Sequence, residues 1–396
     1  MSTLGPLPFV VWMSSYVLLA GVLARRWPFF VRERAAVSRA YNVPLEGLRG
    51  LLALSVFFYH GALTYVYFRT GQLGDVTRFY EHCGSSAVLL FFFLTGFLFW
   101  GKLLRVGAPA VLQFMRARAW RIGPAYVLSV ALVVLISAAR SHFRLVESGM
   151  VVAVEIVRWC CFGFCGFPDI NAVPKTILAN SGVFWTLEWE WVFYLVLPLL
   201  GWFARGRRVV LLAGVFACVY ELSVARGGQG GLGRVFLTGF YPGMLTAHFV
   251  RTRFAARLAQ SRWSALIPVV AIAAAILLSP KNLLMVPVLC VAFATIAAGV
   301  DVLGLLRLPG LIFLGRISYS TYILHGAVLF VGTRAIDRCL PIASMSPSVY
   351  WACIGALGIA VVLVSALSFQ FVEHPFLNGV HTRPVRLSGA PTPQEA

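Results

Sequence analysis

Charged residues are scarce in this sequence, and acidic residues are the scarcest of them. Only 12% of the 396 residues are charged and 60% are hydrophobic, whereas a soluble domain carries roughly 25% charged residues. No polar stretch is long enough to form a separate soluble domain. The composition therefore excludes an ordinary soluble protein and favours one domain that has the lipid bilayer as its main solvent.

The shortage of acidic residues leaves a net charge of +19, from 33 basic and 14 acidic residues. A nucleic-acid-binding protein gathers its basic residues on one polar face, but here they lie in short segments between apolar runs, so no nucleic-acid partner is expected. The positive-inside rule and anionic lipid headgroups account for most of them. Some arginines remain for an anionic substrate or cofactor. No cysteine or histidine spacing indicates a metal site, and we expect no metal.

Long apolar runs are what the sequence has in abundance. A membrane span needs about 20 mostly apolar residues. Because backbone groups in lipid must bond within the segment, and because these runs are too long for barrel strands, they predict helices. We predict an all-α polytopic membrane protein with ten or eleven transmembrane helices. The predicted spans are 8–24, 47–68, 84–101, 122–139, 184–203, 208–224, 234–250, 263–279, 282–300, 310–331 and 350–372.

The distribution of basic residues predicts the orientation. The arginines after the first span indicate that 8–24 is a retained helix, whose C-terminal end lies in the cytoplasm, rather than a cleaved signal peptide. The loops that share the side of 25–46 hold nearly twice as many basic residues as the opposite loops. We therefore predict an external N-terminus and a cytoplasmic C-terminus. The long external segment 140–183 contains an apolar stretch, 150–167, that favours an interfacial or re-entrant helix.

Ionisable residues inside spans are rare and are candidates for function. Arg49 and His60 lie eleven residues apart in LEGLRGLLALSVFFYH, which places them on one helix face, about 16 Å apart. A histidine can accept a proton at neutral pH, so His60 is a candidate general base. The alternative is a structural histidine bonded to a neighbouring helix, with Arg49 extending to the membrane surface.

The segment WTLEWEWVFY contains a second candidate, Glu190. It lies roughly 9 Å below the external end of its span, which is about the depth of His60. We therefore expect the Glu190 carboxylate to orient the His60 imidazole and to stabilise its protonated form. The tryptophans around it, including Trp185, are typical of an interfacial aromatic belt, and they are equally suited to stack on sugar rings.

Two further polar groups accompany these residues. Ser318, Tyr322 and His325 follow i, i+4, i+7 spacing and predict one polar stripe on a helix, which either contacts substrate or hydrogen-bonds a neighbouring helix. A cluster of arginines precedes the span at 122–139 on the predicted cytoplasmic side. It binds either lipid headgroups or the phosphates of a nucleotide or coenzyme A. The cluster consists of Arg116, Arg118 and Arg121.

Six short motifs follow one another between residues 45 and 376. They are the Arg49 and His60 pair within an acidic-Gly-x-Arg-Gly opening at Glu46–Gly50, FFFLTGFLF at 91–99, the arginine cluster followed by Pro124 and Tyr126, the set Trp185, Glu190, Phe193 and Tyr194, the SYS-x-Y-x-x-H motif at Ser318–His325, and the closing Glu373–Pro375. Together they resemble the acyltransferase-3 family, membrane acyltransferases that O-acetylate bacterial surface polysaccharides and some lipids and antibiotics. The sequence departs from the family pattern at Thr95, usually serine, and at Trp191, often a second glutamate.

The resemblance implies a bundle of ten helices, to which the span at 8–24 is an addition. It divides the chain into an extra N-terminal helix with a basic linker (1–44), an acyltransferase membrane domain (45–376) and a disordered cytoplasmic tail (377–396). The chain is similar to stand-alone members without a C-terminal SGNH esterase-like domain. Such members deliver the acyl group themselves or hand it to a separate extracytoplasmic partner. The resemblance also implies a bacterial inner membrane.

The same resemblance implies the chemistry. The donor would be a cytoplasmic acyl-CoA, most often acetyl-CoA, and the acceptor a carbohydrate or glycolipid of the cell envelope. His60 would act as base or briefly accept the acyl group, with Glu190 beside it, and Tyr194 would belong to the substrate or structural set. The arginines that would hold the coenzyme A phosphates are Arg49, Arg116, Arg118, Arg121 and Arg316.

Two other classes of protein stay open from the residues alone. A transporter or flippase of a lipid-linked sugar would also have buried charges and a basic inner face, although the sequence lacks the internal repeat that many transporters show. A structural scaffold for glycan assembly is the other class. It predicts that His60 and Glu190 can be replaced without loss.

Overall fold

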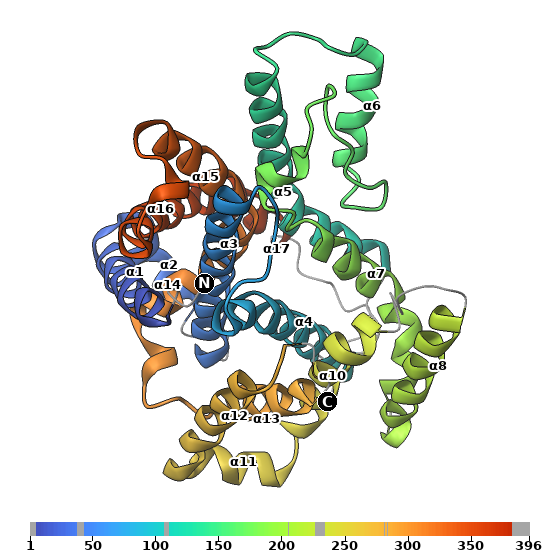
Figure 1. Ribbon diagram of the computed structural model, residues 1–396. Coiled ribbons are helices and arrows are strands. Elements are labelled where there is room, and N and C mark those ends of the chain that lie inside the picture. Colours follow the sequence, from blue (N-terminus) through green and yellow to red (C-terminus); the bar gives the residue numbers. More distant parts are fainter. Residues whose placement is uncertain are drawn as a thin grey trace.

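The computed structural model describes residues 5–37, 43–106, 111–204, 206–225, 234–280, 282 and 284–381, and within these ranges every regular element is a helix (Figure 1). The predicted all-α fold is confirmed. The α-helices in chain order are α1 (Leu7–Arg26), α2 (Pro28–Val37), α3 (Val43–Thr70), α4 (Arg78–Val106), α5 (Val111–Arg140), α6 (Gly149–Trp159), α7 (Trp185–Leu200), α8 (Leu211–Ala225), α10 (Tyr241–Phe249), α11 (Arg253–Gln260), α12 (Leu266–Leu277), α13 (Met285–Ala297), α14 (Pro309–Arg316), α15 (Ser318–Cys339), α16 (Pro347–Ser368) and α17 (His374–His381).

Every predicted span falls on a helical segment, but not every segment is a long helix. Within the described ranges six helices are long and apolar enough to cross a membrane, or seven if the bent pair Arg253–Gln260 and Arg262–Leu277 counts as one span. The helices α8, α10 and α13 are shorter. The predicted number of ten or eleven spans therefore stays a prediction, whereas the polytopic membrane architecture is supported directly.

One predicted span is broken. The run 310–331 was expected to form a continuous helix, but it consists of α14 and α15, which meet at Ile317. The amide of Ile317 still donates to the carbonyl oxygen of Phe313 at 3.3 Å, and its own carbonyl accepts from the amide of Thr321 at 2.9 Å. These backbone groups thus stay bonded across the break, as the apolar interior requires.

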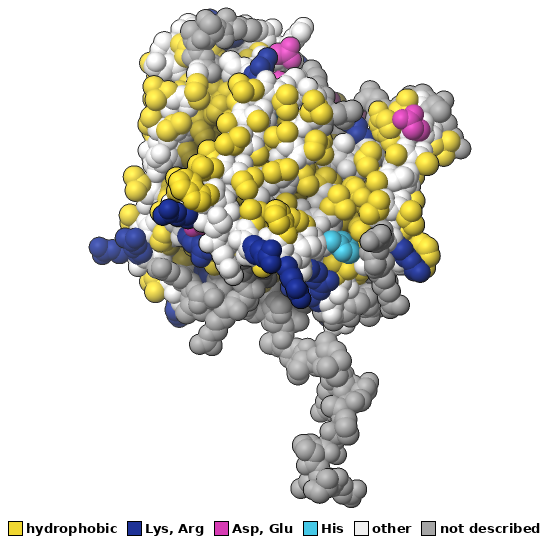
Figure 2. All heavy atoms as spheres, turned by 90° about the horizontal axis from the view of Figure 1, so that it is seen from below, with side chains coloured by type: hydrophobic (Ala, Val, Ile, Leu, Met, Phe, Trp, Pro, Cys, Tyr) yellow, Lys and Arg dark blue, Asp and Glu magenta, His cyan; other side chains and the backbone are white. Residues whose placement is uncertain are grey.

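The surface of the bundle suits a lipid environment. Figure 2 shows hydrophobic side chains spread over the face in view, with lysine and arginine side chains gathered along its lower rim. Exposed apolar side chains occur on many helices; Leu199 is 75% exposed and Leu277 76%. A soluble monomer rarely exposes so much contiguous apolar surface, so these faces are the lipid-facing wall of an integral membrane protein.

The centre of the bundle is α3, which packs against α4, α14 and α15 (Figure 1). Glycines allow the backbones of α3 and α14 to touch. A Cβ on Gly50 would clash with the carbonyl oxygen of Leu311, and one on Gly315 with the carbonyl oxygen of Glu46. Small residues at helix crossings permit such contact inside a membrane. This crossing holds Arg49 and the end of α14 on the same side of the bundle.

The extra N-terminal helix α1 is packed into the bundle. It contacts α14 and α16, and a Cβ on Gly310 would clash with the carbonyl oxygen of Val17. Tyr16 is fully buried, and its hydroxyl donates to the carbonyl oxygen of Gly355 at 3.0 Å. The linker after it forms α2, whose Phe30 is also buried. The helix therefore adds core contacts to the elements that carry the polar motifs.

Replacing Gly315 with alanine should destabilise the protein by about 1–3 kcal/mol, because the new methyl group meets backbone that cannot move without opening the α3–α14 crossing. The matched control is Gly123→Ala, where nothing lies within 4 Å of the added Cβ, so the change should be neutral or slightly stabilising. Thermal unfolding of the detergent-purified variants measures both. Equal midpoints for the two variants would contradict the close crossing.

The predicted interfacial stretch contains α6, eleven residues long, which is too short to span. Its side chains are mostly exposed, but Trp159 at its end is fully buried, and the indole nitrogen of Trp159 donates to the carbonyl oxygen of Pro168 at 2.8 Å. The carbonyl oxygen of Trp159 accepts a hydrogen bond from the hydroxyl of Tyr126 on α5 at 2.5 Å. These bonds join the end of α6 to the middle of α5.

Candidate active site

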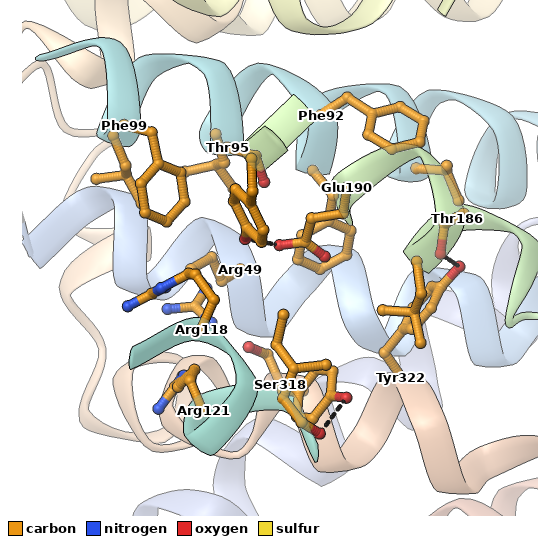
Figure 3. A pocket seen from close by; sticks show the side chains of 18 of the residues that line it. Arg49, Phe92, Thr95, Phe99, Arg118, Arg121, Thr186, Glu190, Ser318 and Tyr322 are labelled. Atoms are coloured by element: carbon orange, nitrogen blue, oxygen red, sulfur yellow. Dashed lines mark hydrogen bonds between the residues drawn. The ribbon is translucent and has the colours of Figure 1, made fainter. Parts of the chain in front are cut away.

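A cavity of about 420 Å³ lies between α3, α4, α5, α7 and the α14–α15 junction (Figure 3). We call it the arginine chamber, because four arginines and only two carboxylates line it. Hydroxyl groups and aromatic rings complete the wall. The charged and hydroxyl-bearing residues of the lining are Glu46, Arg49, Thr95, Arg118, Arg121, Thr186, Glu190, Tyr194, Arg316, Ser318, Tyr319 and Tyr322.

The charges of the arginine chamber are unbalanced in favour of the cations. Arg49 forms an ion pair with Glu46 at 3.4 Å, so one carboxylate is already used. The guanidinium of Arg118 lies 4.9 Å from the centre of the Phe99 ring, and its Nε is buried without a hydrogen-bond partner among the described residues. Figure 3 shows the side chains of Arg49, Arg118 and Arg121 gathered on one side of the pocket. Such a set suits phosphate oxygens.

Glu190 belongs to the arginine chamber and not to the surroundings of His60. Its carboxylate accepts a hydrogen bond from Tyr194, one turn later on α7, and the charged groups that act on it are Arg118, Arg49 and Arg121. Within the described part of the chain no hydrogen bond joins it to His60. The prediction rested on equal depth along two helices. Depth does not fix the direction in which a side chain points, and Glu190 points towards the arginines.

His60 lies between two other cavities. One, of about 690 Å³, is lined by His60, Tyr59, Glu81, Trp185 and Tyr322 among others, and we call it the histidine chamber. The second is a side pocket of about 70 Å³. His60 lines both. Its imidazole is therefore reachable from either cavity, which a general base needs.

The close neighbour of His60 is a second histidine. The His325 ring is fully buried, and its centre lies 5.2 Å from that of His60. Its Nδ1 lies 3.0 Å from the carbonyl oxygen of Thr321, which can only accept, so Nδ1 carries the proton. Nε2 has no partner among the described residues and, in the neutral ring, is an acceptor. The pairing of His60 with His325 was not predicted from the sequence.

The stripe of Ser318, Tyr322 and His325 runs from one chamber to the other. Ser318 lines the arginine chamber, Tyr322 lines both chambers, and His325 stands beside His60. The hydroxyl of Tyr322 lies 3.0 Å from that of Thr186 and 3.2 Å from the carbonyl oxygen of Val183. Figure 3 shows the first of these bonds at the far end of the pocket from the arginines. Tyr322 is thus part of the wall between the two chambers.

Removing the Tyr322 hydroxyl should have a modest and specific cost. We expect Tyr322→Phe and Thr186→Val each to lower stability by about 0.5–1.5 kcal/mol. The hydroxyl left in either single variant can still donate to the carbonyl oxygen of Val183. The double variant leaves that carbonyl without either hydroxyl, so it should be less stable than both single variants. Thermal unfolding of the three variants measures this. A double variant as stable as the single variants would contradict this hydrogen-bonded set.

The remaining predicted residues separate into two groups. Arg316 and Tyr194 line the arginine chamber, and Trp185, which is 46% exposed, lines the histidine chamber. Arg116 is exposed and lines neither. The sequence carried a signal for this difference. Arg118 and Arg121 are about 60° apart around a helix, whereas Arg116 and Arg118 are about 160° apart.

Sequence reasoning missed Tyr319 and Thr186 as chamber residues. Tyr319 donates to the carbonyl oxygen of Ile122 at 2.8 Å, and this contact between α15 and α5 has no signature in the sequence. Glu46 was noticed only as part of a motif. Its i, i+3 spacing to Arg49 is the signal that predicts the ion pair. Within the described ranges no group of three or more histidine, cysteine or acidic side chains is placed to hold a metal.

Comparison with known proteins shows the family of the chain. The family model described as an acyltransferase domain, of the acyltransferase-3 type, matches residues 42–367. The chain is also 27% identical over 398 residues to "Acyltransferase MdmB" of Streptomyces mycarofaciens, a match that covers 90% of this chain and 98% of that protein. No solved structure matches the chain significantly. The motifs around both chambers lie within the matched residues, and the chain belongs to the acyltransferase-3 family of acyltransferases.

Proposed function

We propose that this protein transfers an acyl group, in the first place acetyl, from acyl-CoA to a hydroxyl of a cell-envelope carbohydrate or glycolipid. The observation that carries the proposal is the pair of chambers with different chemistry that share Tyr322. One chamber has an excess of arginine for a phosphate-bearing donor, and the other contains the histidine that an acceptor hydroxyl needs. Membership of the acyltransferase-3 family favours this reaction over transport or a scaffold.

The donor fits the arginine chamber by its charge. Arg118 has a buried Nε that makes no hydrogen bond with a described residue, and Arg49, Arg121 and Arg316 add further guanidinium groups in the same cavity. Guanidinium groups bind phosphate oxygens in a bidentate manner. With the orientation predicted from the basic loops, this chamber opens towards the cytoplasm, where acyl-CoA is made. A donor bound in this way would have its thioester end towards Tyr322, which lines both chambers.

His60 would act as the general base. Its imidazole takes the proton of the acceptor hydroxyl, and the oxygen attacks the thioester carbonyl carbon. The carbon–sulfur bond then breaks, and the leaving thiolate takes the proton from the imidazolium, so that coenzyme A is released as the thiol and His60 is neutral again. His325 would position His60, because the acceptor lone pair on its Nε2 is available to a ring N–H of its neighbour. Glu190, bonded to Tyr194 among the arginines, would shape the donor site.

The test begins with the purified protein in lipid nanodiscs and radiolabelled acetyl-CoA. Release of coenzyme A thiol, together with label in an alkali-labile ester on an envelope extract, is the expected result. In the source cell, proton NMR of surface glycans and glycolipids should show an O-acyl ester signal that disappears on deletion and returns with the wild-type chain. No thioester consumption with acetyl-CoA or longer acyl-CoA in the presence of the extract would refute the proposal and move the transporter class forward.

A further inference from the structure

The ends of α5 and α15 beside the side pocket carry arginines that form no ion pair with a described residue. The guanidinium carbon of Arg334 lies 3.4 Å from the centre of the Phe330 ring, and that of Arg140 lies 5.8 Å from the same centre. A third cation, Lys175, lies 5.3 Å from the centre of the Tyr67 ring. In the part of the chain that the structure describes, none of the three forms an ion pair. We call Arg140, Lys175 and Arg334 the outer basic cluster.

Arg140 and Arg334 have guanidinium N–H groups that make no hydrogen bond with a described residue. Arg140 donates through Nη2 to the carbonyl oxygen of Pro174 at 2.8 Å, and Arg334 donates to the carbonyl oxygen of Phe330 at 3.3 Å. The Nη1 of Arg140 is buried and has no partner among the described residues. The acid that acts on Arg334 is Asp337, whose Oδ1 already accepts from the amide of Ile342. Two cations that share one ring repel each other, and a bound anion would relieve that repulsion.

The side pocket next to this cluster has the size and lining of an anion site. Its volume is about 70 Å³, which is about two waters' share of the liquid and therefore too small for a sugar ring. Arg334 lines it, and no acidic residue does. The other polar lining groups are His60, Thr64, Tyr67, Ser181 and Thr333. The hydroxyls of Thr64 and Thr333 already donate to the carbonyl oxygens of His60 and Leu329, so the groups that can donate to an anion beside Arg334 are His60, Tyr67 and Ser181.

The position of the pocket connects it to the proposed chemistry. His60, Leu63 and Ser181 line both the side pocket and the histidine chamber. A molecule with an anionic group in the pocket would therefore extend past His60 into the larger chamber. The arginine chamber is a separate anion site, because Arg49 and His60 are about 16 Å apart along α3.

We propose that the side pocket and the outer basic cluster bind a phosphate or carboxylate group of the acceptor, and thereby hold its hydroxyl at His60. The acceptor class is then an acidic sugar or a phosphate-linked glycolipid, not a neutral glycan. The identification of the bound molecule as the acceptor rests on the proposed function. Binding of an anion to the site can be measured without any acyl transfer.

The experiment measures binding of inorganic phosphate to the detergent-purified full chain by thermal unfolding, at constant ionic strength set with sodium chloride. All proteins carry Arg118→Gln, which weakens phosphate binding in the arginine chamber. Phosphate should raise the unfolding midpoint saturably, and adding Arg140→Gln with Arg334→Gln should weaken the apparent affinity at least tenfold, since charge-assisted bonds are lost. Arg338→Gln, an exposed arginine one turn further along α15, is the matched control and should leave the affinity unchanged.

Two arms separate the sources of the anion. Acetate in place of phosphate tests for a carboxylate, and saturable stabilisation by either supports the site. Nanodiscs with and without phosphatidylglycerol test for a lipid headgroup. If that lipid abolishes the phosphate effect, a headgroup fills the pocket and the acceptor assignment is overturned. The anion site is overturned if the Arg140→Gln, Arg334→Gln protein responds to phosphate as its parent does.

Arg334→Lys distinguishes the loss of an anion site from a folding defect. It keeps the charge and should keep the affinity for phosphate within about tenfold of its parent.

Thioester consumption, measured on chains without the Arg118→Gln substitution, separates the proposed anion site from the proposed acyl transfer. Its absence in the wild type would refute the proposed function, yet it would leave the phosphate result unchanged.

Discussion

Replacing His60 with alanine should lower the rate of acyl transfer by about 10²- to 10⁴-fold, which is the contribution expected of a positioned general base. The physical reason is its place in the structure. The imidazole lines the histidine chamber, and its ring centre lies 5.2 Å from that of His325. No other described histidine of the chamber lining is available to replace it. Coenzyme A release at saturating acetyl-CoA and acceptor gives the rate.

The matched control is His248→Ala on α10. This histidine accepts a hydrogen bond from the indole nitrogen of Trp100 at 2.9 Å and lines none of the three cavities. Its loss should cost about 1 kcal/mol of stability and leave the transfer rate of the folded protein close to wild type. A well-inserted His60→Ala protein with wild-type activity would remove His60 from the mechanism.

The same measurement of coenzyme A release tests the role of His325. His325→Gln should reduce the rate less than His60→Ala does, because glutamine can still donate to the carbonyl oxygen of Thr321 and accept from His60.

Glu190→Gln should change the KM for acyl-CoA, because Glu190 lines the arginine chamber. The KM for the acceptor should stay nearly unchanged. If Glu190→Gln instead raised only the KM for the acceptor, the assignment of Glu190 to the donor site would be contradicted.

Most of the helical architecture is predictable from apolar length, because a run of about 20 apolar residues has one stable form in lipid. The break at Ile317 is not predictable in this way. Just before the break, Gly315 lies against the backbone of Glu46, a contact between residues far apart in the sequence. The family motifs supply candidate site residues, but they do not say which of them meet.

The Glu190 prediction shows the limit most clearly. The rise per residue gives depth along a span, and the depths of Glu190 and His60 are similar. The direction of each side chain depends on how α3 and α7 are turned within the bundle, and that is decided by packing. The i, i+4 partner Tyr194 was visible in the sequence and is the contact that forms. Local spacing therefore predicted the neighbour of Glu190 better than depth did.

Replacing Arg118 with glutamine should raise the KM for acyl-CoA by roughly 10- to 150-fold, because one or two charge-assisted hydrogen bonds contribute about 1.5–3 kcal/mol. The side chain is held over Phe99 inside the arginine chamber with an unpartnered nitrogen. It is thus already ordered before the donor arrives, and little conformational entropy remains to be lost on binding.

The control for this prediction is two residues away. Arg116 has the same charge and lies on the same helix, but it is exposed and lines no chamber. If the arginines acted only through lipid headgroups, Arg116→Gln and Arg118→Gln would have equal effects, since both change the net charge by one. If they act through the donor, only Arg118→Gln should change its KM, and the effect should weaken with salt less than a surface effect would. The two variants therefore separate a general electrostatic role of this cluster from a specific one.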